Sequence, residues 1–291
     1  MMRIWLRAKK LNRIKGFDFF NIIILTLFAI ISILPIIFII NNAFKPLSEL
    51  FMFPPEFFVR NPTMQNFNNL LSTMSESLVP FSRYFFNSIL VTCISVILTV
   101  VFSSTAAFAF SKGNFPGKDM LFKLIVVSLM FSPAAVSITR YLVISKLGLI
   151  NSYAALILPQ LAMPVGVFLI KQFMDQLPNE LLEAAKIDGA STWMTFYKIV
   201  IPNVKIAIGT VMILAFQTVW MDSDSSALYI ISEAKKTFPY FVTTLTSGLT
   251  NTVANQGASA ASVLLLFLPN FIIFAIMQKS IMETMVNSGI K

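Results

Sequence analysis

Six long apolar runs restrict the fold of this chain more than any other feature of its sequence. They cover residues 19–44, 85–110, 120–142, 153–173, 206–221 and 260–277. A helix needs about 20 mostly apolar residues to cross a bilayer. Only 12% of the 291 residues are charged, which is about half the usual share in soluble domains. The runs therefore predict an all-α integral membrane protein with six transmembrane helices, of which the fifth is the weakest because Asp222 and Asp224 end it early.

The residue types that are missing exclude several kinds of chemistry. The chain has no His and a single Cys, Cys93, which lies inside the second apolar run. Histidine–metal sites, Ser–His triads and intrachain disulfides are thereby excluded. We expect no catalytic residue, no metal site and no cofactor bound by this chain. The net charge of +9 does not imply nucleic-acid binding, because excess Lys and Arg in a membrane protein commonly marks its cytoplasmic side.

The positions of Lys and Arg predict the orientation in the membrane. The segment before the first run has six basic residues and one acid, Asp18. With that segment inside the cell, nine lysines also fall on the cytoplasmic side, namely Lys112, Lys118, Lys123, Lys171, Lys186, Lys198, Lys205, Lys279 and Lys291. Together these are fifteen of the 22 basic residues. Both termini are therefore expected in the cytoplasm, in agreement with the positive-inside rule.

This topology divides the chain into five segments. They are a basic cytoplasmic tail (1–18), the first span (19–44), an extracellular loop (45–83), a core of five helices (84–280) and a cytoplasmic tail (281–291). A cleaved signal peptide is the alternative for the first run. Its apolar core would be about 7–15 residues long, whereas this run is longer and has no small-x-small cleavage site. We therefore expect an anchored first span.

The longest polar stretch on the cytoplasmic side lies in the loop at 174–204. Asn179 is expected to cap a short helix that Gly189 ends in a left-handed conformation. Four residues at helical spacing would share one narrow face, namely Leu181, Ala184, Ala185 and Asp188. Ser191 is expected to cap a second helix over 193–201, which Pro202 ends or kinks. From spacing alone, an amphipathic helix lying on the membrane surface is the alternative reading.

A longer pattern in this loop resembles the EAA loop of ABC importer permease subunits. It consists of Glu-Ala-Ala at 183–185, Asp-Gly-Ala at 188–190 and a hydrophobic-Pro pair at 201–202, where Ile201 replaces the usual Leu. The resemblance implies a type I ABC importer permease fold with a cytoplasmic coupling helix that docks on an ATPase. The coupling residues that it implies are Glu183, Ala184, Ala185, Asp188, Gly189, Ala190 and Pro202.

Other segments extend the resemblance to the carbohydrate (maltose-type) subfamily, over nearly the whole chain. Residues 147–159 are similar to the lead into the fourth span of such permeases. The outer loop has the subfamily's Lys-Pro, Glu, Pro-Pro, Pro-Thr and Asn-aromatic positions at 45–46, 49, 54–55, 62–63 and 66–67, with Phe67 where Tyr is usual. The end of the chain is similar to a short tail that reaches the ATPase, which implies contacts from Gly289 and Lys291.

The resemblance also implies a function and a set of partners. Such a permease imports a sugar or oligosaccharide across the bacterial plasma membrane by alternating access and hydrolyses nothing itself. Its implied partners are a second, different permease, a dimer of ATP-binding subunits that hold ATP and Mg, an extracellular solute-binding protein and the lipid bilayer.

Four residues near the spans are candidates for the substrate pathway, namely Gln160, Gln217, Trp220 and Asp222. Polar groups within a membrane avoid lipid because facing it unpaired is costly, and aromatic faces and amide or carboxylate groups commonly hold sugars. An interfacial aromatic anchor is the favoured alternative for Trp220, and bonding between helices is the alternative for the two Gln residues. Arg140 is expected to be a snorkelling or paired charge.

Two other classes of function leave different marks on a sequence. An ion-coupled secondary transporter or channel would have several ionisable groups in the middle of its spans, and these spans have almost none. A membrane enzyme would need a cluster of catalytic residues at one membrane face, and no such cluster is visible. The sequence therefore favours the importer permease.

Overall fold

The computed structural model describes residues 16–75, 79–247 and 255–289, and within these ranges every regular element is helical. The first half contains α1 (Gly16–Phe44), α2 (Leu47–Leu50), α3 (Gln65–Ser75), α4 (Phe81–Lys112), α5 (Lys118–Ser128) and α6 (Pro133–Lys146). The middle contains α7 (Tyr153–Leu161), α8 (Pro164–Asp175), α9 (Asn179–Ile187), α10 (Thr192–Thr195), a π-helical turn η1 (Phe196–Val200) and α11 (Ile201–Asn203). The remainder contains α12 (Lys205–Trp220), α13 (Asp224–Tyr229), a 3-10 turn η2 (Glu233–Lys235), α14 (Phe238–Ser247) and α15 (Asn255–Gly289).

Four segments of the described chain are long and apolar enough to cross a membrane. They are Phe20–Phe44 in α1, Phe81–Lys112 in α4, Tyr153–Asp175 in α7 and α8, and Gln256–Gln278 in α15. A fifth is added if Thr192–Asn203 and Lys205–Trp220, which meet at a bend of 81°, count as one span. The predicted all-α membrane architecture is confirmed, whereas the predicted count of six spans is not.

The third predicted span, 120–142, accounts for the difference. The structure has two helices there, α5 and α6, and each is too short to cross a membrane. Pro133 begins α6 and has no N–H to continue a hydrogen-bonded helix from α5. Ser132 before it is extended, with φ −68° and ψ 137°, as residues that precede proline usually are. The apolar run is continuous in sequence, but the helix is interrupted between α5 and α6.

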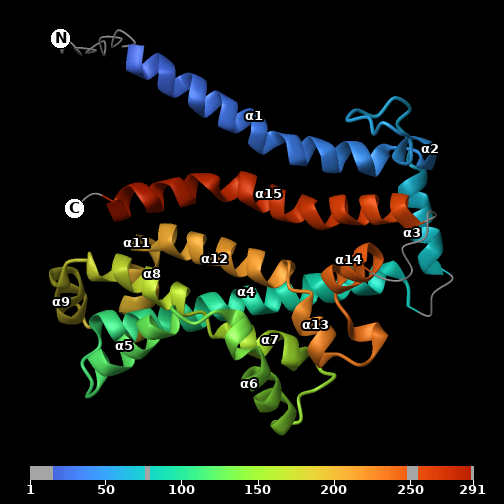
Figure 1. The fold of residues 1–291 in the computed structure, drawn as a ribbon. Helices are drawn as coiled ribbons and strands as arrows, with labels where there is room; N and C mark the ends of the chain where they lie inside the picture. The colour runs from blue at the N-terminus through green and yellow to red at the C-terminus, as the bar shows by residue number, and fades with distance from the viewer. Residues whose placement is uncertain (1–15, 76–78, 248–254, 290–291) are drawn as a thin grey trace.

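Helix α4 lies in the middle of the molecule, with α7 and α8 packed along one side and α12 along another (Figure 1). Its inward face is a row of small polar residues, all buried, namely Ser88, Thr92, Ser95, Thr99 and Ser103. Small side chains let helix backbones approach closely, which is the main source of helix association in a membrane. We call these five residues the α4 seam.

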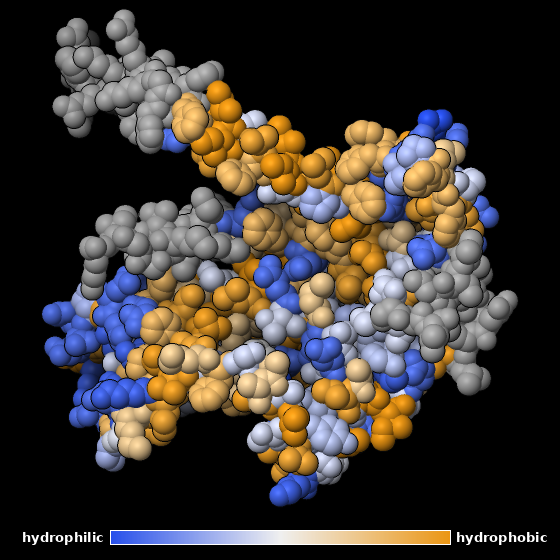
Figure 2. Space-filling model, viewed as in Figure 1, coloured by the Kyte–Doolittle hydropathy of each residue, from blue (hydrophilic) through white to orange (hydrophobic). Residues whose placement is uncertain are grey.

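The two ends of the molecule differ in what they contain. Helix α9, the start of α1 and the end of α15 lie at one end, and α2, α3 and α14 lie at the other (Figure 1). Hydrophilic side chains gather around α9, whereas α1 shows a hydrophobic surface over its length (Figure 2). The end with α9 also carries Lys112, Lys186 and Lys205, which are among the lysines predicted to face the cytoplasm.

The closest approach on the α4 seam gives a test of the packing. A Cβ added at Gly166 of α8 would lie 2.9 Å from Ser103 Oγ and 3.1 Å from Val211 Cγ1. We expect Gly166→Ala to destabilise the protein by about 1–3 kcal/mol, because the added carbon overpacks the joint. The measurement is the thermal unfolding midpoint of the purified protein in detergent.

Two further variants make this test specific. Adding Ser103→Ala to Gly166→Ala should recover most of the lost stability, because the Ser103 hydroxyl is the nearest obstacle. Val165→Leu, on the exposed side of α8, should leave the midpoint unchanged. An unchanged midpoint for Gly166→Ala would show that α4 and α8 are not tightly packed there.

Candidate coupling segment and membrane cavity

Helix α9 is attached to the end of α4 by a lysine. Lys112, the last residue of α4, donates from Nζ to the carbonyl oxygen of Leu177 at 2.7 Å and to Asn179 Oδ1 at 3.0 Å. The predicted capping role of Asn179 is wrong. Pro178 occupies the cap position with no side-chain hydrogen bond, and Asn179 is the first helical residue. Its amide therefore holds the helix to α4 instead of capping it.

A second polar contact joins the ends of α4 and α8 just before this point. Ser111 donates to Asp175 Oδ1 at 2.6 Å, and Lys171 Nζ pairs with Asp175 Oδ2 at 2.6 Å. The Lys171 ammonium also lies 4.5 Å from the centre of the Phe122 ring on α5. We call Ser111, Lys112, Lys171, Asp175 and Asn179 the latch, because together they connect α4, α8 and α9.

The far end of α9 is closed by a Schellman motif. Gly189 has φ +80°, its N–H donates to the carbonyl of Lys186 at 3.1 Å, and the N–H of Ala190 donates to the carbonyl of Ala185 at 2.9 Å. This pair of bonds requires a left-handed residue between them, which is why glycine occupies the position. The predicted left-handed Gly189 is confirmed.

The implied coupling residues do not all face the same way. Glu183, Ala184, Asp188 and Gly189 are exposed, whereas Ala185 is only 6% exposed and turns into the protein. Ala190 is half-buried. The face proposed for Leu181, Ala184, Ala185 and Asp188 is therefore divided between solvent and the interior.

Three large exposed apolar side chains near α9 were not among the residues predicted from the sequence, namely Ile187, Trp193 and Tyr197. They lie on α9, α10 and η1, at the same end of the molecule as the exposed part of α9. Their sequence gives no distinct signal, since apolar residues that are more buried, such as Phe196 and Val200, stand in the same loop. We call them the apolar rim.

The second helix of this loop leads into the bend before α12. Ser191 accepts from the N–H of Met194 at 3.3 Å, so its predicted capping role is confirmed. The helix continues through η1 to Asn203, two residues beyond the predicted end, and the 81° bend follows. Pro202 lies immediately before the bend and lacks an N–H for the preceding turn.

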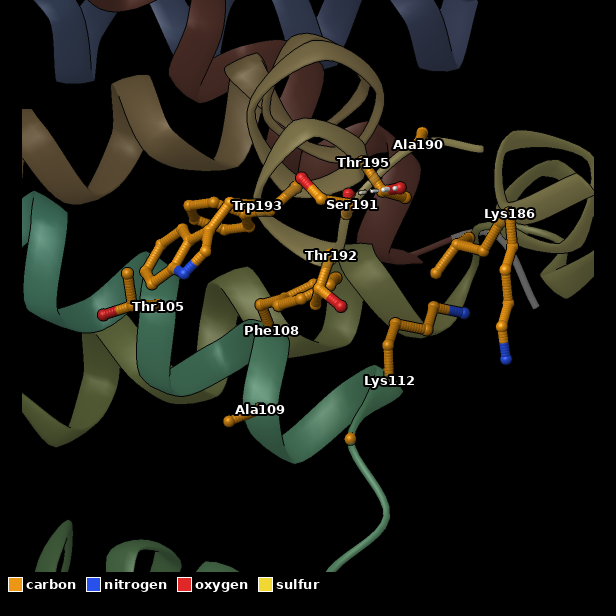
Figure 3. A pocket seen from close by; sticks show the side chains of 13 residues that line it. Thr105, Phe108, Ala109, Lys112, Lys186, Ala190, Ser191, Thr192, Trp193 and Thr195 are labelled. Carbon is orange, nitrogen blue, oxygen red and sulfur yellow. Dashed lines mark hydrogen bonds between the residues drawn. The ribbon is translucent and has the colours of Figure 1, made fainter. Parts of the chain in front are cut away.

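A groove of about 690 Å³ separates the end of α4 from α10. Trp193 lies at one end of it beside Thr105 and Phe108, and Lys112 and Lys186 lie at the other (Figure 3). Its wall is mostly apolar and has a basic mouth, so it can accept an apolar side chain followed by an acidic group.

A larger cavity of about 1170 Å³ lies between α6, the α7–α8 break, α12 and α13. Three of the four predicted pathway residues line it, namely Gln160, Gln217 and Asp222. Gln160 Nε2 donates to Asp222 Oδ2 at 2.6 Å, and the N–H of Ser225 donates to Asp222 Oδ1 at 3.0 Å. The carboxylate is thus fixed at the wall by two donors.

Arg140 and Tyr229 add to the polar wall of the same cavity. Burial raises the pKa of the Tyr229 hydroxyl, and the nearby Arg140 guanidinium partly offsets that rise. Tyr229 is therefore a neutral hydrogen-bonding group at physiological pH. Arg140, Asp222 and Tyr229 together give the cavity one cation, one anion and a hydroxyl.

Trp220, the fourth candidate, lies elsewhere. It is 2% exposed, its indole N–H donates to the carbonyl of Leu266 at 2.9 Å, and its ring stacks on Phe216 with centroids 5.6 Å apart. It joins α12 to α15 and lines neither the cavity nor an exposed aromatic belt. The local sequence around a tryptophan at a helix end is the same whether its ring lines a cavity or packs between two helices.

Comparison with known proteins now gives the family. The sequence model for the binding-protein-dependent transport system inner membrane component matches residues 18–281. The chain belongs to this family. It is thus a membrane transport subunit and not an enzyme, and the alternative of an ion-coupled secondary transporter is not supported.

The sequences of individual relatives align with almost the full length of this permease. It is 32% identical to Protein LplC of Bacillus subtilis (strain 168), over 94% of this chain and 95% of that protein. It is 27% identical to the arabinooligosaccharides transport system permease protein AraQ of Halalkalibacterium halodurans, over 90% and 92%. A crystal structure of a bacterial ABC transporter involved in the import of the acidic polysaccharide alginate has a chain with TM-score 0.80 and 18% identity, covering 96% of this chain and 99% of that one.

The remaining candidate residues of the permease lie at its C-terminus. Gly289 is the last residue of α15, while Lys291 and most of the basic tail at 1–18 lie outside the described residues. Among the residues that the structure describes, no group of three His, Cys, Asp or Glu side chains could hold a metal ion.

The latch gives a prediction about α9. Lys112→Met removes both hydrogen bonds by which Lys112 Nζ attaches α9 and the preceding Leu177 to α4. At about 1 kcal/mol for such a partly exposed pair of bonds, the backbone amides of residues 179–187 should exchange with deuterium roughly five times faster. Hydrogen exchange with mass spectrometry measures this directly.

Lys123→Met is the matched control, because Lys123 is an exposed lysine on the neighbouring α5. It should leave exchange in residues 179–187 unchanged. Equal exchange in wild type and Lys112→Met would show that the latch does not hold α9.

Proposed function

We propose that this chain is the permease of an ATP-driven importer for a sugar or oligosaccharide and that α9 is its coupling helix. The observation that carries the proposal is that the latch attaches α9 to α4 at Asn179, while the Schellman motif ends the helix sharply at Gly189. A short helix held in this way transmits a displacement, whereas a flexible loop would absorb it.

The proposed partner of α9 is an ATP-binding subunit, of which two would serve the importer and hold the ATP and Mg. Glu183, Ala184, Asp188 and Gly189 would contact it from the exposed side of α9. The apolar rim would surround that contact. Buried Ala185 and half-buried Ala190 would set the position of α9, and Gly289 and Lys291 would add contacts from the C-terminus.

Closure of the ATPase would move α9 and the helices attached to it. The latch connects α9 to α4 and α8, and the bend after Pro202 connects the same loop to α12. Helix α12 ends beside Asp222 in the cavity wall. A displacement of α9 would therefore reach the cavity through α4, α8 and α12. The cavity would then open alternately to the two sides of the membrane.

The proposed topology has six spans and two cytoplasmic ends. Counting α5 and α6 together as the third span and α12 with its bent predecessor as the fifth restores the predicted number. Residues 1–18 and 281–291 are then cytoplasmic tails, 45–83 is extracellular, and 84–280 is the core with its coupling loop at 174–204. The common position of α9, the start of α1 and the end of α15 in Figure 1 supports this arrangement in a bacterial plasma membrane.

The sugar assignment is supported by the relatives and by the cavity. Relatives are named for arabinooligosaccharides, lactose and sulfoquinovosyl glycerol. The cavity wall offers amide, carboxylate, guanidinium and hydroxyl groups, which suit a polyhydroxylated solute. A second, homologous permease would complete the pathway, and an extracellular solute-binding protein would deliver the cargo.

Gly189 provides the test of coupling. Gly189→Val places a β-branched residue at φ +80°, a left-handed conformation that costs an ordinary residue about 1–2 kcal/mol and a β-branched one more. We expect ATP-driven uptake in proteoliposomes to fall more than tenfold, while membrane insertion and assembly with the second permease remain normal.

Gly189→Asn is the matched control, because asparagine adopts the left-handed conformation readily. It should retain at least half of the wild-type uptake. Normal uptake by Gly189→Val would contradict the proposed role of α9.

Asp222 provides the test of the pathway. Asp222→Asn removes the charge and weakens the bonds from Gln160 and Ser225. We expect its uptake of the transported oligosaccharide to fall about tenfold, with binding to the solute-binding protein unchanged. Asp224→Asn, an exposed carboxylate at the same cavity, should stay within twofold of wild type, and equal losses in both variants would argue against a specific role for Asp222.

A further inference from the structure

The segment after α2 folds back along the end of α1. The centroids of the Phe57 and Phe38 rings are 6.0 Å apart, and the N–H of Val59 donates to Asn41 Oδ1 at 3.0 Å. The loop between α2 and α3 lies beside the last turns of α1 in Figure 1. Phe57 and Val59 therefore lie level with the last two turns of a membrane span and not beyond it.

The depth of Phe38 in the bilayer follows from the length of α1. Phe38 precedes the end of α1 at Phe44 by six residues, or about 9 Å along the helix axis. The span Phe20–Phe44 has 25 residues and is thus about 37 Å long, compared with about 30 Å for the hydrocarbon core of a bilayer. With α1 centred in the membrane and aligned with its normal, Phe38 lies about 6 Å inside the hydrocarbon boundary, and the Phe57 ring lies near that boundary, 6.0 Å from the Phe38 ring.

The tip of the folded-back segment is apolar and exposed. The side chains of Phe53 and Phe58 are 93% and 66% exposed, and Phe51 and Met52 are also exposed. The Phe58 ring lies 5.2 Å from that of Phe57, which in turn lies beside the exposed Phe38 of the membrane-spanning α1. Exposed phenylalanine side chains are among the apolar residues with which interfacial segments enter the boundary of the bilayer.

Several polar groups that flank the segment are bonded within the protein. Glu49 accepts from the N–H groups of Arg60 and Asn61, each at 2.9 Å, and these bonds hold the pKa of its carboxyl below the usual value. Lys45 Nζ donates to the carbonyl of Glu56, and the Glu56 carboxylate pairs with Arg60. Internal bonding of this kind is what backbone near hydrocarbon requires.

We propose that residues 51–58 insert into the boundary between acyl chains and headgroups at the end of α1, and that lipid covers Phe53 and Phe58. The segment is an interfacial anchor that fixes the depth of α1. A few side chains at a loop tip are a small surface compared with the roughly 800 Å² per partner of a stable protein interface. Insertion of about 5–10 Å is the usual depth of interfacial segments, which matches the level of Phe57.

The test is a depth measurement by spin labelling. In a Cys93→Ala background, nitroxide labels are attached to Phe53→Cys and Phe58→Cys in the complete transporter in lipid nanodiscs. Collisions with oxygen, which concentrates in lipid, are compared with collisions with a water-soluble nickel chelate. Ile31→Cys at the middle of the α1 span is the deep reference, and Gln65→Cys, at an exposed position of α3, is the aqueous reference.

We expect both loop labels to show an oxygen-to-nickel collision ratio several times that of Gln65→Cys and below that of Ile31→Cys. A ratio equal to that of Gln65→Cys would place the tip in water and overturn the proposal. Low collision rates with both reagents would show that protein covers the tip, which also overturns it. The measurement needs neither ATP nor solute, so a failure of the importer function in a parallel uptake assay would be recognised separately.

Discussion

Close approach of helices along the α4 seam is the constraint on which the rest of the structure depends. Lipid is as apolar as a leucine side chain, so helices in a bilayer associate through tight contact and hydrogen bonds. Ser103 lies against Gly166 of α8, Thr99 donates to the carbonyl of Gln160 at the end of α7, and Ser88 accepts from the N–H of Phe238 at the start of α14. Larger side chains at these positions would separate α4 from each of these helices. The seam thereby sets the positions of both the latch and the cavity wall.

Helix α12 is the physical link between those two regions. It begins after the bend that follows Pro202 and ends at Trp220, two residues before the carboxylate that Gln160 holds. Its 16 residues span about 24 Å, and the buried Trp220 ring and indole bond secure its far end against α15. A segment fixed at both ends moves as a unit. The proposed coupling of α9 to the cavity needs this property, in addition to the latch that holds α9 itself.

The sequence predicted features that depend on a few neighbouring residues. The left-handed Gly189, the Ser191 cap and the position of α12 were predicted because each reflects local backbone geometry or a single apolar run. The incorrect predictions share another cause, which is a contact between residues far apart in the sequence. Asn179 binds Lys112, which is 67 residues away in sequence, and no local pattern reports such a partner. Likewise, Ala185 and Trp220 are buried by neighbours whose approach the sequence does not encode locally.

By itself the sequence determined that this chain is an all-helical membrane protein, where most of its spans lie, which family it resembles and which loop carries the family pattern. These follow from apolar runs and short motifs, whose physics acts over one or two helical turns. Only the tertiary structure decided which side of α9 is exposed, which three of four pathway candidates share a cavity, and that the third apolar run is broken. The first two outcomes depend on side chains brought together from distant segments, and the third arises because a proline in an apolar run can either kink a helix or end it.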